Sequence, residues 1–212
     1  MAGSNSEAAR LQMINAQLRT SDINDLDLLA AFAAVPREDF VAPAQRAHAY
    51  GDGEIASSGP AGRKLLSPRT LGLLLKSAAP AKAERALVVG GGAGYCAALL
   101  VALGLDVVAL ETDSSAARAA GLGAAEIVDG PLTEPPPGRF DVIVVNGAFE
   151  ETPTRLIGAL SEGGRLAGLR AGSRVKQIVL FERSGGGVSE RGLYDASGDV
   201  LPGFARAPAF AF

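Results

Sequence analysis

The sequence has 212 residues, of which 48% are hydrophobic and 20% charged, and this size and composition fit one globular domain with a full hydrophobic core. The formal net charge is −3 and the basic residues are scattered, which argues against the concentrated basic face of a protein that binds nucleic-acid backbones. Cys96 is the only cysteine, which excludes a disulfide within the chain and a cysteine metal cluster.

The beginning of the sequence lacks the charged-then-apolar pattern of a secretion signal. No apolar run approaches the roughly 18 residues that are needed to span a bilayer. Together with the single cysteine, these features predict a soluble protein of the reducing cytoplasm that has neither a membrane partner nor a nucleic-acid partner. Cys96 itself is expected to be a small buried hydrophobic residue.

The first 35 residues are expected to form two helices. Leu11, Ile14 and Leu18 recur at the spacing of one helix face. Asp25 is placed to cap a second helix, which Pro36 then ends.

A loop and a third helix are expected next. Residues 50–64 are rich in Gly and Ser and show no periodicity, which predicts a surface loop. Ser67 and Pro68 stand in the order of an N-cap and a first helical residue, and Leu71, Leu74 and Leu75 continue the helix.

From residue 85 the sequence alternates short apolar runs with helical segments. The expected strands are 86–89, 107–110, 126–128, 141–146 and 165–169, and the expected helices are 95–103, 115–120 and 152–160. Residues 175–182 and 188–194 flank the turn-forming segment 184–187 and predict a β-hairpin. This order predicts an α/β protein with a mostly parallel, doubly wound, Rossmann-like sheet and an antiparallel edge hairpin.

A glycine loop connects the first of these strands to its helix. Gly90, Gly92 and Gly94 allow a sharp turn and a close approach of the backbone to a ligand, and the helix that follows presents free N–H groups. Such a string is weak evidence by itself, but Glu111 ends the next strand about 20 residues later, where an acid can accept both hydroxyls of a ribose. The alternative for Glu111 is a solvated loop acid. The spacing leaves S-adenosylmethionine and NAD open, although a dinucleotide fingerprint usually reads G-x-G-x-x-G.

Several segments together resemble the protein-L-isoaspartate O-methyltransferases, especially the shorter bacterial members, from about Met13 to the end. The similar segments are Gln-Leu-Arg at 17–19, Val-Pro-Arg-Glu-Asp-Phe-Val at 35–41, the glycine loop with its tyrosine at 89–95, Glu111, Asp-Gly at 129–130, the strand at 140–145, the helix-to-strand turn at 156–165 and, loosely, Leu-Pro-Gly-Phe at 201–204.

The resemblance implies a class I S-adenosylmethionine-dependent methyltransferase fold and a site. Residues 1–80 would form an N-terminal helical region with a substrate-side loop, and residues 81–212 the methyltransferase domain, together one compact unit. Ser67 would lie nearest the acceptor. The implied cofactor-binding residues are Gly90, Gly91, Gly92, Gly94, Tyr95, Glu111, Thr112, Asp129, Gly130 and Asn146; no metal is implied.

The implied reaction is methyl transfer to the free carboxylate of isoaspartyl residues in damaged proteins or peptides. A carboxylate has a reference pKa near 4, so this nucleophile is already ionised at neutral pH. Holding its oxygen in line with the sulfonium methyl then supplies most of the acceleration, and no general base is needed.

Two positions depart from the family pattern. Val88 stands where the family usually carries an acid that orients the methionine portion of the cofactor, and the loss of a charged hydrogen-bond partner costs about 1.5–3 kcal/mol. Leu66 stands at the serine of the "ISxP" motif, and Ser67 lies one residue later. In addition, the turn after the fourth strand, which is rich in small Thr or Ala residues in the family, is Asn-Gly-Ala-Phe at 146–149 here and includes the bulky Phe149.

These departures leave three hypotheses. The first is the methyltransferase, with Ser67 and Arg63, Lys64 or Arg69 binding the acceptor carboxylate. The second is a degenerate methyltransferase fold with a binding or scaffold role and no isoaspartyl repair, which Val88 and Leu66 favour. The third is an NAD-type oxidoreductase, which the tight glycine spacing disfavours.

Overall fold

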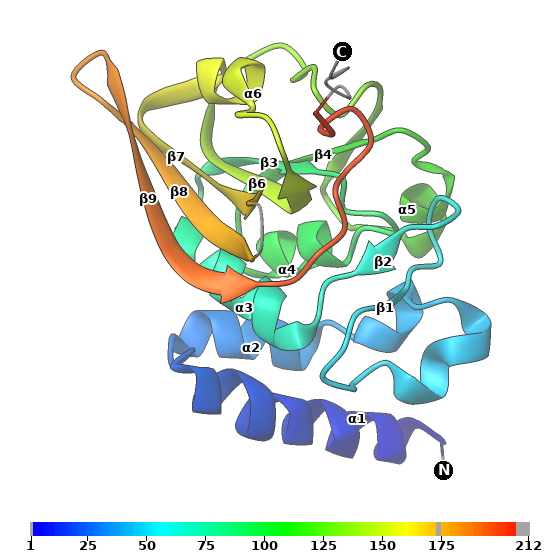
Figure 1. The fold of residues 1–212 in the computed structure, drawn as a ribbon. Coiled ribbons are helices and arrows are strands. Elements are labelled where there is room, and N and C mark those ends of the chain that lie inside the picture. The colour runs from blue at the N-terminus through cyan, green and yellow to red at the C-terminus, as the bar shows by residue number, and fades with distance from the viewer. Residues whose placement is uncertain (1, 173–174, 207–212) are drawn as a thin grey trace, which may run out of the picture.

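The computed structural model describes residues 2–172 and 175–206, and a seven-stranded sheet lies at its centre (Figure 1). The strand order is β5-β4-β3-β6-β7-β8-β9; the pairs from β5 to β7 are parallel and the last two pairs are antiparallel. The strands are β3 (Arg85–Val89), β4 (Asp106–Glu111), β5 (Glu126–Asp129), β6 (Phe140–Phe149), β7 (Leu160–Ala171), β8 (Lys176–Ser184) and β9 (Gly187–Ala196). The expected parallel sheet with an antiparallel edge hairpin is confirmed.

Alternate residues of the central strands supply two separate cores, one on each face of the sheet. In β3, Ala86 and Val88 belong to one buried cluster, whereas Leu87 and Val89 belong to the other. The same alternation divides β4 and β6. Because both faces are covered, successive residues in the middle of these strands are apolar, which is why they stand out as continuous runs in the sequence.

Helices cover both faces of the sheet. On one face lie α3 (Pro68–Ala78) and α4 (Tyr95–Ala102), with α2 (Leu26–Ala34) and the outermost α1 (Ala2–Met13) beneath them (Figure 1). The helix α6 (Thr154–Gly158) packs on β7, and its Leu156 and Ile157 belong to the cluster on the opposite face. The remaining helix, α5 (Ser115–Ala120), follows β4. In the described ranges, no helix is long and apolar enough to cross a membrane.

The expected helix caps are present. The side chain of Asp25 accepts a hydrogen bond from Leu28 N at 2.8 Å, and that of Ser67 accepts one from Thr70 N at 3.1 Å. The first helix continues beyond Met13 as a π-helical turn (Ile14–Leu18) and a 3-10 turn (Arg19–Ser21).

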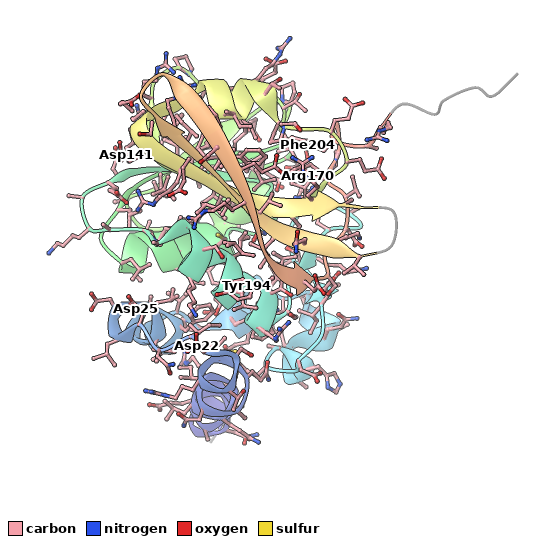
Figure 2. All side chains as sticks on the ribbon, turned by 60° about the vertical axis from the view of Figure 1, so that its left-hand side comes forward. Asp22, Asp25, Asp141, Arg170, Tyr194 and Phe204 are labelled. Atoms are coloured by element: carbon pink, nitrogen blue, oxygen red, sulfur yellow. The ribbon has the colours of Figure 1, made fainter. Side chains whose placement is uncertain are left out.

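The N-terminal layer is attached to the sheet through Lys76 of α3. Its Nζ lies 2.6 Å from Asp22 Oδ2 and 5.8 Å from the ring centroid of Tyr194 in β9. Figure 2 labels both partners, which lie on either side of α3. One hydrophobic cluster likewise contains residues of α1, α2, α3 and the central strands.

Two expectations are corrected. The segment 50–64 is not an irregular surface loop, because β1 (Ile55–Ala56) pairs antiparallel with β2 (Lys64–Leu65) and Ser57 N donates to Arg63 O at 2.9 Å. The strand expected at 141–146 continues to Phe149, because the segment 199–204 pairs with its end. Ala148 N donates to Asp199 O at 2.8 Å, and Leu201 N donates to Ala148 O at 2.9 Å.

Candidate functional site

The glycine loop lies at the carboxyl end of β3, in the middle of the parallel part of the sheet. β3 pairs with β4 on one side and with β6 on the other, which makes this the crevice where doubly wound sheets bind ligands. Gly90 and Gly92 have φ values of 72° and 63°, a conformation that favours glycine. A Cβ on Gly90 would lie 2.7 Å from Arg63 Nη2 and 2.8 Å from Leu201 Cδ1.

Glu111 ends β4 beside this loop and is only 3% exposed. Its Oε2 accepts a hydrogen bond from Gly92 N at 2.8 Å and lies 3.4 Å from Arg63 Nη2. Its Oε1 accepts from the backbone N and the Oγ1 of Thr112 at 2.9 and 3.1 Å. The alternative of a solvated loop acid is therefore wrong: the carboxylate is buried and held against the glycine loop.

The remaining implied cofactor residues surround Glu111. Asp129 lies opposite it in the strand register, and Gly130 N donates to Glu111 O at 3.0 Å. Asp129 accepts from Ser114 N at 2.7 Å and pairs with Arg118 at 3.3 Å, and these contacts hold the pKa of Asp129 below its ordinary value.

Asn146 reaches the loop from the other side. It lies in β6, is 5% exposed, and its Nδ2 is 3.4 Å from Gly90 O. The structure thus brings the expected residues of β3, β4, β5 and β6 to one edge of the sheet.

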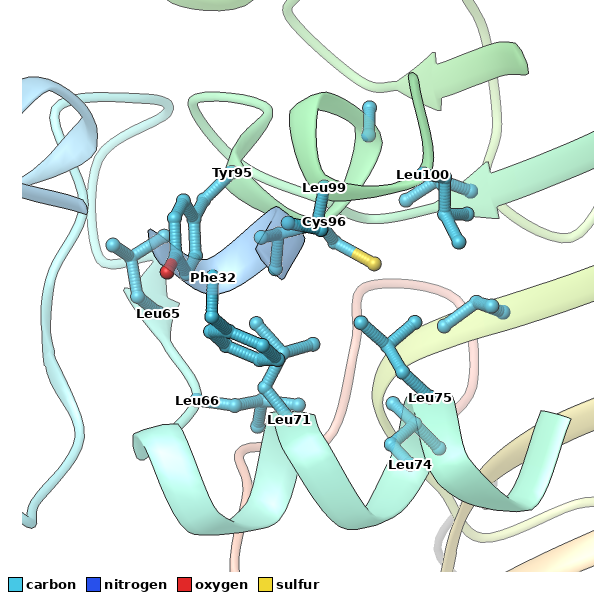
Figure 3. Close-up of a cluster of buried hydrophobic side chains, with 14 of the residues drawn as sticks. Phe32, Leu65, Leu66, Leu71, Leu74, Leu75, Tyr95, Cys96, Leu99 and Leu100 are labelled. Carbon is cyan, nitrogen blue, oxygen red and sulfur yellow. The ribbon is translucent and has the colours of Figure 1, made fainter. Parts of the chain in front are cut away.

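Tyr95 occupies a different environment from the other expected cofactor residues. It begins α4, but its side chain is 1% exposed and packs against Phe32 and Phe40, at ring-centroid distances of 6.3 and 5.4 Å. Figure 3 shows it beside Phe32 and Leu65, in the cluster between α3 and α4. The Tyr95 side chain is therefore turned into the core, and a contact of this residue with a cofactor stays a prediction. Cys96 is buried as expected, and burial raises its pKa to about 12.

A roof over the glycine loop comes from residues 57–66; sequence reasoning named Arg63 and Lys64 of this segment as candidates for the acceptor carboxylate but missed Ser57 and Gly59. Ser57 Oγ accepts hydrogen bonds from Ala93 N at 3.1 Å and from Gly59 N at 3.0 Å. A Cβ on Gly59 would lie 2.7 Å from Ala93 N, so the two backbones touch. Arg63 Nη2 donates to Gly90 O at 2.5 Å. No local pattern distinguishes Ser57 from other serines of this Gly- and Ser-rich segment.

Arg37 holds this roof in place and is completely buried. Its Nε donates to Ala49 O at 2.8 Å and its Nη2 to Leu66 O at 2.7 Å, so one guanidinium joins both ends of the segment 49–66. It also lies 5.2 Å from the centroid of the Tyr95 ring. The sequence signal for Arg37 was its place in the segment 35–41 that carries the family resemblance.

The C-terminal segment 199–204 closes the site from the side. Leu201 would lie 2.5 Å from a Cβ on Gly147, and Lys64 Nζ pairs with Asp199 Oδ2 at 3.0 Å. A cavity of about 190 Å³ remains between this segment, the roof and Asn146. Only the loose likeness at 201–204 pointed to this segment.

The structure locates the three positions on which the sequence hypotheses depend, which are Val88, Leu66 and Ser67. Val88 is 1% exposed and packs in the core below the loop, with its Cγ1 3.2 Å from a Cβ built on Gly91. Leu66 lines the cavity of about 190 Å³. Ser67 instead lines a separate, open cavity of about 590 Å³ together with Arg69, and its Oγ is bonded to Thr70 at the start of α3. A catalytic contact of Ser67 stays a prediction.

Comparison with known proteins agrees with this geometry. The sequence profile of a family described as protein-L-isoaspartate(D-aspartate) O-methyltransferase (PCMT) matches residues 9–192. A protein-L-isoaspartate O-methyltransferase of Methylorubrum populi is 36% identical over 168 residues, which cover 76% of this chain and 78% of the relative. One of Koribacter versatilis is 34% identical over 191 residues, which cover 86% of this chain and 85% of the relative.

Two solved structures share the fold. A protein-L-isoaspartate O-methyltransferase superposes with a TM-score of 0.79 and 23% identity over 92% of this chain, which spans 66% of the length of that structure. A Plasmodium falciparum beta-aspartate methyltransferase (PCMT) in complex with S-adenosyl-L-homocysteine has a TM-score of 0.77 and 18% identity, covering 92% of this chain and 97% of its own. The profile match and the curated relatives establish that the chain belongs to the protein-L-isoaspartate(D-aspartate) O-methyltransferase family.

Proposed function

We propose that this protein transfers a methyl group from S-adenosylmethionine to the carboxylate of L-isoaspartyl residues in damaged proteins. The observation that carries the proposal is the buried carboxylate of Glu111 beside the glycine loop. An acid at the end of the second strand, next to a backbone turn that has no Cβ in the way, fits a nucleoside whose ribose hydroxyls donate to it. Family membership supplies the class of reaction.

The residues at the sheet edge fit this cofactor. Glu111 would accept from the ribose, and Asp129 lies one strand further out, where an adenine would follow. The side chains of Arg63, Leu201 and Ser57 occupy the space in front of Gly90 and Gly92, and they would move aside when the cofactor binds. When bound, S-adenosylmethionine supplies an electrophilic methyl group on a sulfonium. The protein contributes position: Glu111 fixes one end of the site, and the roof with Leu201 covers the other end.

The acceptor needs no deprotonation, because a carboxylate is ionised at neutral pH. This accounts for a site without a histidine: His48, the only one in the chain, is exposed on the N-terminal region. We propose the substrate side at the roof and the neighbouring start of α3, where Ser67 remains the candidate acceptor-side residue and Arg69 is exposed beside it.

Two measurements test the proposal. Calorimetric titration with S-adenosylhomocysteine is expected to show binding to one site, and no binding at millimolar ligand would refute the enzyme hypothesis. Transfer of a tritiated methyl group is then expected to an isoaspartyl peptide and not to the same peptide with a normal aspartyl residue. Cofactor binding with no transfer to the isoaspartyl peptide would refute the proposed acceptor.

A second candidate function is a binding protein without turnover, and Val88 and Leu66 favour it. Both are buried hydrophobic residues where the family resemblance implies an acid and a serine. This candidate predicts that S-adenosylhomocysteine and S-adenosylmethionine bind, and that no methyl group is lost from the latter in the presence of isoaspartyl peptide.

A further inference from the structure

Two residues that line the cavity beside the glycine loop each carry a buried polar atom without a hydrogen-bond partner among the residues that the structure describes: Nη1 of Arg63 and Oδ1 of Asn146. The Arg63 side chain is 11% exposed and Asn146 is 5% exposed. Buried donors and acceptors in proteins are nearly always paired, so two unpaired atoms at one cavity call for an explanation, such as a bound group, an ion or a water. The two atoms are of opposite kind, one a cationic donor and the other an acceptor.

Both side chains converge on one backbone atom. Arg63 Nη2 donates to Gly90 O at 2.5 Å, and Asn146 Nδ2 lies 3.4 Å from the same oxygen. The unpaired donor and the unpaired acceptor therefore belong to two groups that meet at the first glycine of the loop. The carboxylates that also line the cavity, those of Glu54 and Asp199, lie 3.9 and 3.0 Å from Lys64 Nζ.

The size of the cavity restricts what it can hold. Its volume is about 190 Å³. Sites that bury a whole drug-sized ligand measure roughly 300–1,000 Å³. The cavity therefore suits one end of a cofactor whose other end lies along the glycine loop toward Glu111. An α-amino acid, with its carboxylate and ammonium on one carbon, is one such group: it accepts from a guanidinium and donates to an amide oxygen a few atoms away.

We propose that Arg63 and Asn146 bind the amino-acid end of the cofactor, Arg63 through the carboxylate and Asn146 Oδ1 through the ammonium. The proposal rests on the proposed function. These two side chains would take the place of the acid that the family usually carries at the position of Val88. A substrate carboxylate alone fits less well, because it offers no donor to Asn146 Oδ1.

The test compares two ligands by calorimetry on the full chain: S-adenosylhomocysteine, and 5′-methylthioadenosine, which has the same nucleoside and no amino-acid end. Arg63→Met is expected to weaken S-adenosylhomocysteine about 10- to 100-fold, as the loss of a charge-assisted contact implies, and 5′-methylthioadenosine by less than about twofold. Asn146→Ala is expected to show the same selectivity with a smaller loss. Arg46→Met, which removes an exposed charge from the same N-terminal region, is the matched control and should change neither affinity.

Each other result overturns the inference. Equal losses for both ligands would mean that Arg63 supports the loop, and tighter binding of S-adenosylhomocysteine would mean that Arg63 competes with the cofactor for Glu111 and Gly90 O. A thermal unfolding midpoint for each variant shows whether a loss comes from misfolding, and Arg63→Lys, which keeps the charge, should then restore part of the selectivity. If the parent protein binds neither ligand, the proposed function fails as well; if it binds both and only the selectivity is absent, this inference alone fails.

Discussion

Replacing Glu111 by glutamine tests the ribose contact with little change in shape. The carboxylate accepts from Gly92 N at 2.8 Å through one oxygen and from Thr112 through the other. Glutamine keeps one acceptor and puts an NH₂ group in place of the second, so either Gly92 N–H or Thr112 N–H loses its acceptor, and the ribose hydroxyls meet a neutral amide in place of a carboxylate. Hydrogen bonds to a charged group contribute about 1.5–3 kcal/mol, which corresponds to a 10- to 100-fold weaker affinity for S-adenosylhomocysteine.

Calorimetry gives the affinity, and urea denaturation gives the stability, which is expected to fall by about 1–3 kcal/mol because a buried donor then faces a donor. Asp106→Asn is the control: it removes the same charge at the opposite, exposed end of β4 and should leave the affinity unchanged. If folded Glu111→Gln protein binds S-adenosylhomocysteine within twofold of the parent, Glu111 does not hold the ribose.

Four further outcomes are expected. Arg37→Met should lower the free energy of unfolding by roughly 2–5 kcal/mol in urea, because two buried carbonyls lose their donor; a loss below about 1 kcal/mol would contradict the anchoring role. Gly59→Ala should weaken S-adenosylhomocysteine by displacing the roof from the glycine loop, whereas Gly53→Ala, which has open space around its Cβ, should not; equal calorimetric affinities would remove the roof from the site. Cys96 should resist iodoacetamide at pH 8 until urea unfolds the protein, because burial raises its pKa to about 12 and leaves little thiolate; rapid labelling of the native protein, measured by mass spectrometry, would disprove this burial. Asp129 has a depressed pKa in the folded state, so it stabilises the fold above its unfolded pKa of about 3.9, and this stabilisation is lost as the pH falls through the lower folded pKa. Asp129→Asn should therefore flatten the fall in the free energy of unfolding at acid pH. An unchanged fall would count against the contacts that lower the pKa.

The sequence predicted those parts of the fold that depend on local signals. Continuous apolar runs marked the strands buried on both faces, and Asp25, Ser67 and Pro68 marked helix starts. The same local logic found the glycine loop and Glu111, because a backbone turn and a strand end are both visible in a short stretch of residues.

Contacts between distant segments were out of reach of such signals. The contacts of Ser57 with Ala93 and of Arg37 with Leu66 join segments that are far apart in the sequence. The residues around a serine or an arginine do not indicate such a distant partner. The burial of Leu201 over Gly90 likewise depends on the return of the chain from β9. Ser67 shows the opposite case, since its cap is a local signal and is observed, while its contact with an acceptor stays a prediction.

Because the roof connects the N-terminal layer to the glycine loop, we expect ligand binding and the ordering of this layer to be coupled. Arg37 fixes the roof, and the roof touches the loop that would hold the ligand. We therefore propose that residues 1–80 and 81–212 open together rather than as separate domains. Any ligand of the glycine loop then slows amide hydrogen exchange across residues 37–66, and a substitution far out in α2 reduces affinity only as far as it lowers the fraction of molecules in which the roof is closed.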